Sequence, residues 1–291
     1  MTPDRIINSY KEIEELLINS NLSFDNLKYL AKEVSANSWS PYSQFPVGAV
    51  AVGIDQNKNI KVFSGTNVEP TIPLSVCAER NAIFSGISAG YKKFIAIAVS
   101  CPKVFEKSQN NKVEINNLTP CGACREVILQ KVDHKGIILL DGADRIFTPK
   151  DLLPHPMLDQ NKLKNITIEE MDTLDFARNA LHNAQVPYTK EKCGVAILLE
   201  VTKEIFSGTT VDSTSFGCSV EPLKAAFGSL VAKGNLKNKI KAIAFAFPFV
   251  KYPPGDALQI ISDYCDPKTK IIIDNMGTTT IEELLPWAFK L

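Results

Sequence analysis

Three cysteines and one glutamate stand at spacings that could support metal chemistry. Cys121 and Cys124 lie in "TPCGACREV", while Cys77 and Glu79 lie in "CAER". Taken alone, Cys121 and Cys124 could equally be a structural zinc clip, a redox pair or buried packing residues. Three thiolates that leave the fourth position of Zn²⁺ open are typical of catalytic sites, whereas structural zinc sites have four protein ligands. With Cys77 included, the pattern favours a catalytic zinc.

Glu79 stands two residues after Cys77, so its side chain leaves the backbone in a different direction from the ligand. It can therefore flank the metal without binding it. A carboxylate in that place can take a proton from zinc-bound water and pass it to a substrate nitrogen, which is general acid–base work.

The three cysteines also lie at or near the N-termini of predicted helices. The positive end of a helix dipole favours a thiolate and lowers its pKa. Three thiolates around Zn²⁺ leave a negative site, and Arg80 and Arg125 each stand next to a ligand. These two arginines are candidates to offset that charge by hydrogen bonds to the ligands. Each could equally be an exposed helix charge.

The elements that must position these residues alternate between helix and strand, which predicts an α/β layer structure. Two amphipathic helices are expected first, the second with Ser23 or Asp25 as its N-cap. Two strands joined by the polar turn "DQNKN" follow as a hairpin. The expected ranges are helices at 6–18, 27–34, 77–90 and 124–131, and strands at 47–54, 60–65, 94–100 and 136–140.

The chain then repeats itself. "SPYSQFPVGAVAV" returns as "VPYTKEKCGVAIL", "FSGTNVE" as "FSGTTVD", "KKFIAIAV" as "IKAIAFAF" and "KDLLP" as "EELLP", all in the same order. Four cognate stretches predict two copies of one fold. We place the boundary in the polar stretch 155–165 and expect a helical extension at 1–24, a catalytic domain at 25–158 and a degenerate, non-catalytic domain at 159–291.

The second copy lacks the candidate site. Counting from the matched "FSGT" and from the matched proline aligns Cys77 with Val220, Glu79 with Pro222, Cys121 with Pro254 and Cys124 with Ala257. A cysteine used only for packing would have no reason to disappear together with a glutamate in another segment. The joint loss therefore indicates that the four residues form one unit with one task.

Composition narrows the class of protein. The 32 basic and 32 acidic side chains cancel, which argues against a protein that binds nucleic acid. The charged start "MTPDRIINSYKEIEELL" has no apolar run of signal-peptide or membrane-spanning length, so we expect a cytoplasmic protein without a membrane partner. Seven irregularly spaced cysteines favour reduced thiols or metal ligands over a disulfide framework.

The motifs "SPYSQFPVGA", "NVE", "CAER" and "PCGACR", in this order along the chain, resemble those of the cytidine deaminases, and the duplicated chain resembles their homodimeric two-repeat class over residues 25 to 291. The resemblance implies two tandem three-layer α/β/α domains, each with a mixed sheet of about five strands. It also implies one Zn²⁺ per chain, in the first domain. Two features depart from that class: Cys77 replaces a histidine ligand, and the segment from Glu69 to Cys77 is shorter.

By this resemblance Cys77, Cys121 and Cys124 hold zinc, and Glu79 is the proton shuttle. The implied reaction is hydrolytic removal of the 4-amino group of cytidine or 2′-deoxycytidine in pyrimidine salvage: hydroxide attacks C4, Glu79 protonates N3 and ammonia leaves. The implied substrate contacts are Asn67 and Glu69 to the ribose 3′-hydroxyl, Phe45 against the base, the backbone of Ala78 and Thr119 to the pyrimidine, and Phe216 of the partner chain's second domain closing the pocket.

Three other functions stay open. The protein could deaminate another small aminated heterocycle or a base within a polynucleotide, or it could be a zinc-stabilised scaffold that has lost catalysis. Neutral charge and the ribose pair of "NVE" argue against a polynucleotide, which would block a contact to a 3′-hydroxyl. The presence of Glu79 argues against the scaffold.

Overall fold

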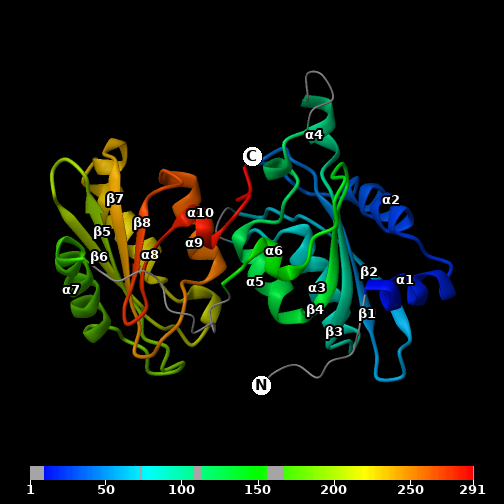
Figure 1. Ribbon diagram of the computed structural model, residues 1–291, viewed down its shortest axis with the longest axis horizontal. Helices are drawn as coiled ribbons and strands as arrows, with labels where there is room; N and C mark the ends of the chain where they lie inside the picture. The colour runs from blue at the N-terminus through cyan, green and yellow to red at the C-terminus, as the bar shows by residue number, and fades with distance from the viewer. Residues whose placement is uncertain (1–9, 72–73, 108–112, 156–166, 291) are drawn as a thin grey trace. The chain divides into compact units, whose positions relative to one another are not determined.

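The computed structural model describes residues 10–71, 74–107, 113–155 and 167–290, and the chain divides into two compact units (Figure 1). The first unit comprises Met1–Pro154 together with Trp287–Leu291, and the second comprises His155–Pro286. The boundary that we predicted between 158 and 159 lies outside the described residues. The final segment, which we assigned to the second domain, belongs to the first unit, as does the predicted helical extension.

The first unit contains, in chain order, α1 (Tyr10–Asn19), α2 (Phe24–Ser35), β1 (Gly48–Ile54), β2 (Ile60–Thr66), α3 (Ala78–Ser88), β3 (Lys93–Ser100), α4 (Pro102–Lys107), η3 (Ile115–Asn117), α5 (Gly122–Lys131), β4 (Val132–Leu140) and α6 (Pro149–Leu152). In their described parts, all eight ranges predicted from periodicity contain the expected type of element, and residues 6–9 of the first predicted helix lie outside the described residues. The predicted N-cap Ser23 begins α2 in a capping box with Asn26, because its hydroxyl accepts from the Asn26 N–H.

The first sheet has the strand order β2-β1-β3-β4. β1 pairs antiparallel with β2 and β3, whereas β3 pairs in parallel with β4, so the sheet is mixed as predicted. It has four strands rather than about five. At its β4 edge an isolated bridge between Ile138 and Phe147 stands where a fifth strand would pair.

Helices cover both faces of this sheet. On one face α1 and α2 bury Ile13, Leu17, Leu27 and Ala31 against β1, β3 and β4. On the other face α3 packs closely on the strands, and a Cβ atom on Gly65 of β2 would lie 2.3 Å from the Ala82 nitrogen of that helix. Glycine is therefore required for this approach, which sets the start of α3 directly over the sheet.

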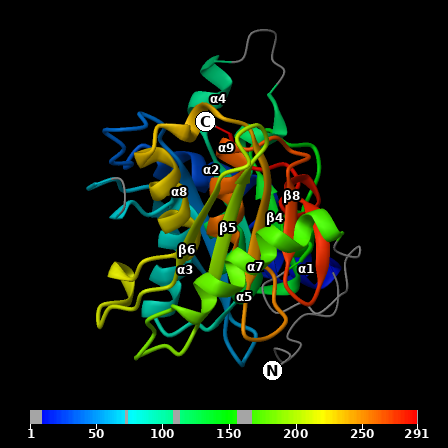
Figure 2. The same cartoon turned by 90° about the vertical axis from the view of Figure 1, so that its left-hand side faces the viewer.

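The second unit contains α7 (Ile168–His182), β5 (Gly194–Leu199), β6 (Ile205–Thr209), η4 (Phe216–Cys218), α8 (Pro222–Ala232), η5 (Asn235–Lys237), β7 (Ile240–Ala246), α9 (Gly255–Tyr264), β8 (Lys270–Ile273), β9 (Gly277–Thr280) and α10 (Ile281–Leu284). Its sheet has the order β6-β5-β7-β8-β9, with β7 and β8 parallel (Figure 2). This is the topology of the first sheet with the fifth strand formed.

The repeat extends to the close contacts. Gly208 of β6 approaches α8 as Gly65 approaches α3, since an added Cβ would lie 2.2 Å from the Pro222 oxygen. Each unit is thus a three-layer α/β/α domain, as the resemblance implies. No helix among the described residues is long and apolar enough to cross a membrane.

Candidate active site

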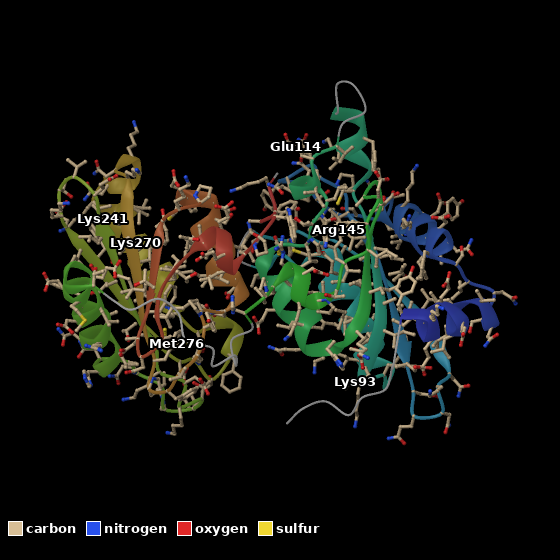
Figure 3. The ribbon with its side chains drawn as sticks, in the orientation of Figure 1. Lys93, Glu114, Arg145, Lys241, Lys270 and Met276 are labelled. Carbon is tan, nitrogen blue, oxygen red and sulfur yellow. The ribbon has the colours of Figure 1, made fainter. Side chains whose placement is uncertain are left out.

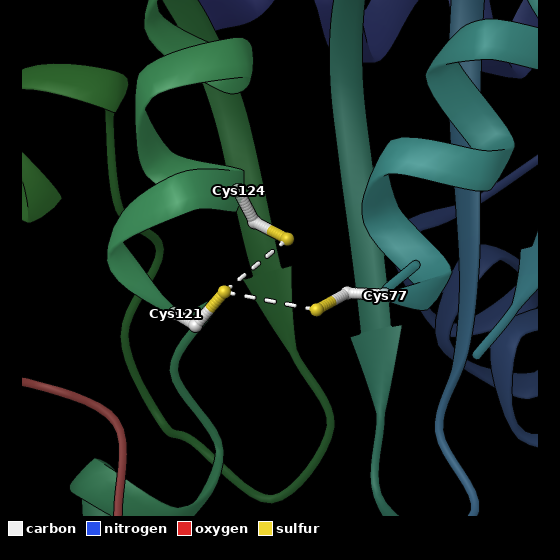
Figure 4. Close-up of side chains that lie close together, drawn as sticks. All are labelled: Cys77, Cys121 and Cys124. Atoms are coloured by element: carbon white, nitrogen blue, oxygen red, sulfur yellow. Dashed lines mark hydrogen bonds between the residues drawn. The ribbon is translucent and has the colours of Figure 1, made fainter. Parts of the chain in front are cut away.

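The three predicted ligands of the first unit meet in one cluster. Figure 4 shows the sulfur atoms of Cys77, Cys121 and Cys124 turned toward one another from α3 and α5. The Sγ atom of Cys121 lies 3.7 Å from that of Cys77 and 3.6 Å from that of Cys124. All three sulfur atoms lie within 4.8 Å of one another.

The topology explains this meeting. α3 leads into β3 and α5 leads into β4, and these strands are parallel neighbours, so both helices begin at the same end of the sheet. Cys77 and Cys121 are the N-cap residues of α3 and α5, and neither side chain caps its helix. Their sulfur atoms are free to face each other at two positive helix ends, where thiolates are favoured.

The thiols share their protons unequally. Hydrogen bonds with Cys124 and Cys77 lower the pKa of Cys121. The hydrogen bond between Cys77 and Cys121 raises the pKa of Cys77 to about 11, and burial raises the pKa of Cys124. Cys121 is therefore the most acidic of the three thiols. Three sulfur donors at this separation, with no fourth protein ligand in the group, fit a tetrahedral Zn²⁺ that keeps one position open.

Glu79 lies beside the cluster in the first turn of α3, with only 4% of its surface exposed. Burial, and next the electrostatic effect of the neighbouring Cys77, raise the pKa of Glu79 to about 7. A carboxyl group with that pKa can both hold and release a proton near neutral pH, which a general acid–base residue requires.

The two arginines have different surroundings. Arg80 lies next to the cluster, with its Nη2 atom 3.7 Å from the Cys77 sulfur. Burial opposes its charge, yet the charges of Cys124 and Cys77 raise its pKa above the ordinary value. These contacts support the charge-offset role predicted for Arg80.

Arg125 is 1% exposed, and its guanidinium donates to three backbone carbonyl oxygens. The acceptors are the oxygens of Pro120 and Leu152, each at 2.7 Å, and the oxygen of Trp287. Burial lowers its pKa to about 10, so it stays cationic at neutral pH. Arg125 is thus neither an exposed helix charge nor placed solely for the thiolates, because it joins the cysteine loop to two other segments of the first unit.

A cavity of about 210 Å³ opens onto the cluster. The residues that line it are Ser43, Phe45, Val47, Asn67, Glu69, Ser75, Val76, Cys77, Glu79, Val99, Cys101, Leu118, Thr119, Cys121 and Phe289. They include most of the predicted site residues of the first domain. A larger hollow of about 350 Å³ lies beside α1 and β4, and none of the predicted site residues lines it.

Asn67 and Glu69 follow β2 and form one polar wall of this cavity. The Asn67 amide donates to the Phe45 carbonyl over 3.0 Å and to Glu69 Oε1 over 3.3 Å, and its Oδ1 accepts from the Val47 N–H over 2.8 Å. The Asn67 side chain therefore joins the segment before β1 to the segment after β2 at the cavity.

Two family models match the chain in tandem. Residues 25–140 and residues 144–246 each match the description "cytidine and deoxycytidylate deaminase zinc-binding region". The chain belongs to the cytidine and deoxycytidylate deaminase family. The first match contains all three cysteines and Glu79.

Individual deaminases are similar over much of their length. A cytidine deaminase of Histophilus somni is 27% identical over 222 residues, which cover 71% of this chain and 66% of that protein. One of Vibrio parahaemolyticus is 25% identical over 251 residues, covering 81% and 78% respectively. The crystal structure of a cytidine deaminase from Burkholderia pseudomallei matches with a TM-score of 0.38 and 24% identity, over 43% of this chain and 100% of that one.

Phe289 is an aromatic residue of the cavity lining that the sequence did not predict. Phe289 packs edge-on against Phe45, with ring centroids 6.1 Å apart. The segment that carries it is held by hydrogen bonds from Thr119 Oγ1 to the Trp287 oxygen, over 2.7 Å, and from the Lys290 N–H to the Asn116 oxygen, over 3.2 Å. No local motif marks Phe289, because its role depends on the chain returning to the first unit.

The remaining predicted contacts are placed as follows. Phe45 is 6% exposed, and Thr119 is buried with its N–H bonded to the Ile115 oxygen. Ala78 is fully buried as the first residue of α3. Phe216 belongs to the second unit, where its side chain is 64% exposed.

In the second, deaminase-like unit the loop before α8 is one residue longer than the corresponding loop before α3 in the first unit. It has one residue more between its bridged valines, Val211 and Val220, than the first unit has between Val68 and Val76. The residue that follows the second valine is the N-cap of the next helix in both units, Cys77 in one and Glu221 in the other.

The alignment of Cys77 with Val220 was therefore wrong by one position, because counting from "FSGT" ignored the longer loop. Cys77 corresponds to Glu221, and Glu79 corresponds to Leu223. The alignment of Cys121 with Pro254 holds, since both are N-caps of the following helix. The loss of the three thiols and the glutamate stands.

Proposed function

We propose that the first unit is a zinc-dependent cytidine deaminase, which converts cytidine and 2′-deoxycytidine to uridine and 2′-deoxyuridine with release of ammonia. The observation that carries the proposal is that two sets of residues line the same cavity. The three-thiol cluster and the buried, protonatable Glu79 lie at one part of it, and the polar pair Asn67 and Glu69 lies at another. Such a cavity suits a small molecule with an aminated ring and a sugar.

Cys77, Cys121 and Cys124 would hold the zinc. When bound there, zinc supplies Lewis acidity that lowers the pKa of water to near neutrality. Arg80 keeps the cluster from becoming excessively negative through its contact with Cys77. The loss of Glu79 and of the cysteines in the second unit fits a single catalytic centre per chain.

Glu79 moves the protons of the reaction. It takes one proton as water oxygen bonds to C4 of the pyrimidine, and gives that proton to ring N3. It then takes the proton of the hydroxyl group now on C4 and delivers it to the 4-amino group as the C4–N bond breaks, so ammonia leaves and a carbonyl oxygen remains at C4. Its pKa of about 7 suits both directions of transfer.

Other residues hold the substrate. Phe45 supplies an aromatic face for the base, and the backbone of Ala78 and Thr119 borders the place where the pyrimidine would lie. Asn67 and Glu69 supply a donor and an ionised acceptor for a sugar hydroxyl. Free nucleosides are favoured over a base in a polynucleotide, because the protein carries no net positive charge.

The wider setting is part of the same proposal. The enzyme would be a cytoplasmic homodimer of pyrimidine salvage, with the partner chain's second domain closing the cavity through Phe216. Support comes from the 64% exposure of this large apolar side chain. If Phe216→Ala leaves KM and kcat unchanged in a persisting dimer, Phe216 does not line the cavity.

The decisive experiment measures zinc per chain and the ultraviolet change on cytidine, 2′-deoxycytidine and a cytosine-containing oligonucleotide. We expect about one zinc per chain and turnover of both nucleosides. Glu79→Ala should lose roughly 10²- to 10⁴-fold in kcat while keeping its zinc. The exposed helix residue Glu33 provides a matched control as Glu33→Ala.

Full activity in Glu79→Ala would overturn the mechanism. A zinc-loaded wild-type protein that converts no nucleoside would favour the scaffold function. Turnover confined to the oligonucleotide would move the substrate class to polynucleotides.

A further inference from the structure

The carboxylate of Glu69 is held by a short turn that precedes β1. Its Oε2 atom accepts from the N–H groups of Tyr42 and Ser43, over 3.2 and 3.1 Å. Its Oε1 atom accepts from the Ser43 hydroxyl over 2.6 Å and from the Asn67 amide over 3.3 Å. Burial works to raise the Glu69 pKa, but the hydrogen bonds from Ser43 outweigh it and hold the pKa below its ordinary value. Glu69 is therefore an ionised acceptor.

The Ser43 hydroxyl also accepts a hydrogen bond, from the Phe45 N–H over 3.1 Å. One hydroxyl group thus contacts both the carboxylate and the backbone of the aromatic residue in the cavity. Between them Gln44 has a φ of 51°, in the left-handed region that non-glycine residues seldom adopt. The surroundings must hold this turn in place.

The second unit contains the same turn, although it lacks the thiol cluster and Glu79. There Asp212 accepts from the Thr189 N–H over 2.8 Å and from the Thr189 hydroxyl over 3.0 Å, and that hydroxyl accepts from the Glu191 N–H over 3.1 Å. Lys190 has a φ of 63°. The turn therefore does not depend on the thiols. What the first unit adds is Phe45 in place of Glu191, and the Asn67 amide.

Each Glu69 oxygen already has two donors, which fills the usual capacity of a carboxylate. The longest of these bonds, at 3.3 Å, is the one from Asn67. A sugar hydroxyl can replace it by accepting from the Asn67 amide and donating to Glu69 Oε1. The Ser43 bonds are shorter and would remain.

We propose that Ser43 is the positioning residue of the sugar site: its hydroxyl keeps the Glu69 carboxylate and the Phe45 backbone in register, so that one sugar hydroxyl can insert between Asn67 and Glu69. This inference rests on the proposed function. It assigns sugar selectivity to a residue that touches neither the metal cluster nor the reacting ring atoms.

The test compares Ser43→Ala with Ser43→Thr on cytidine and on 3′-deoxycytidine. Ser43→Ala removes a hydrogen bond to a charged group, so the ratio of kcat/KM for cytidine over 3′-deoxycytidine should fall roughly tenfold. The loss should lie mainly in the KM for cytidine. Ser43→Thr should restore the ratio, because threonine makes the equivalent contacts at position 189.

Thr189→Ala is the matched control, since it removes the same hydroxyl from the same turn in the second unit. It should lower the unfolding temperature and leave the selectivity ratio unchanged. An unchanged ratio in folded Ser43→Ala, or a ratio lost in Ser43→Thr, would overturn the proposal. If Ser43→Ala does not fold, Ser43→Thr still tests the proposal, because the proposal requires this variant to have the selectivity ratio of the wild-type protein.

Calorimetric binding of uridine and 3′-deoxyuridine to the same proteins gives a second measure of this selectivity that needs no turnover. If the wild-type protein binds uridine selectively but does not deaminate cytidine, the proposed function fails while the role of Ser43 can still be measured. If it deaminates cytidine and Ser43→Ala behaves as wild type, only the role of Ser43 fails. A wild-type protein that binds no nucleoside overturns both.

Discussion

Arg125 donates a hydrogen bond from its Nη2 atom to the backbone oxygen of Trp287, 162 residues further along the chain. Arg125 directly follows Cys124 of the thiol cluster, and Trp287 begins the segment that carries Phe289 into the cavity. One buried guanidinium therefore joins the helix of the thiol cluster to a wall of the cavity. Both belong to the first unit.

Arg125→Ala should destabilise the first unit severely. The buried carbonyl oxygens of Pro120 and Leu152 would lose this donor, whereas the Trp287 oxygen would keep the Thr119 hydroxyl as a donor. At about 1–3 kcal/mol for each unsatisfied group, we expect a loss of at least about 2 kcal/mol in the free energy of unfolding. Urea titration measures this. Arg125→Lys should rescue poorly, because an ammonium group lacks the planar fork.

Arg145→Ala is the comparison for that experiment. Arg145 (Figure 3) lies over the rings of Phe147 and Trp287, 4.5 and 5.2 Å from their centroids. Because its side chain is 51% exposed, its removal should cost less than about 1 kcal/mol. Equal losses in Arg125→Ala and Arg145→Ala would contradict the role that we assign to Arg125.

Phe289→Ala should weaken substrate binding more than it slows the chemical step. The change removes one apolar wall and the edge-on contact with Phe45. We expect KM for cytidine to rise by roughly fivefold to tenfold, the order of one lost aromatic pair, with a smaller change in kcat. Steady-state kinetics measure both. Phe249→Ala, at a half-exposed phenylalanine of the second unit, should change neither value, and an unaltered KM in Phe289→Ala would remove Phe289 from the site.

Cys124→Ala should abolish stable zinc binding. Two thiols remain, and they cannot supply the three-sulfur set that the cluster offers. Zinc per chain, measured by atomic emission after dialysis, should fall from about one to near zero. Cys193→Ala removes a buried thiol of the second unit and should retain the metal. Retention of full zinc by Cys124→Ala would show that the cluster is not the metal site.

Glu221 should make the second unit less stable as the pH rises. It stands at the helix N-cap that corresponds to Cys77, where burial, and next the charge of Asp256, raise its pKa from 4.5 to about 7. Between these two values the folded protein keeps a proton that the unfolded chain has lost. The contribution of Glu221 to the free energy of unfolding is therefore fully present below about pH 4.5 and is lost as the pH rises to about 7.

Glu221→Gln isolates this contribution. Allowing for partial exposure, the wild-type protein should lose on the order of 1–2 kcal/mol more than Glu221→Gln between pH 5 and pH 8. Urea unfolding at the two pH values gives the difference. Identical pH dependence in both proteins would mean that Glu221 is not protonated in the folded state.

The sequence by itself determined the parts whose physics is local. Helix starts follow from capping residues, as at Ser23, and strands follow from apolar runs, so all eight expected ranges of the first unit were recovered. The thiols could be grouped because their chemical types, and their joint loss in the second copy, need no coordinates. The alignment of Cys121 with Pro254 held because a proline marks both loops.

The tertiary structure decided whatever depends on contacts between distant segments. An extra loop residue placed Glu221, not Val220, opposite Cys77. Glu79 has a pKa near 7 because the fold buries it beside Cys77, and spacing alone cannot express burial. Arg125 and Phe289 acquired their roles when residues 287–290 returned to the first unit. That return depends on packing and hydrogen bonds formed across the whole chain, which no local pattern of residues encodes.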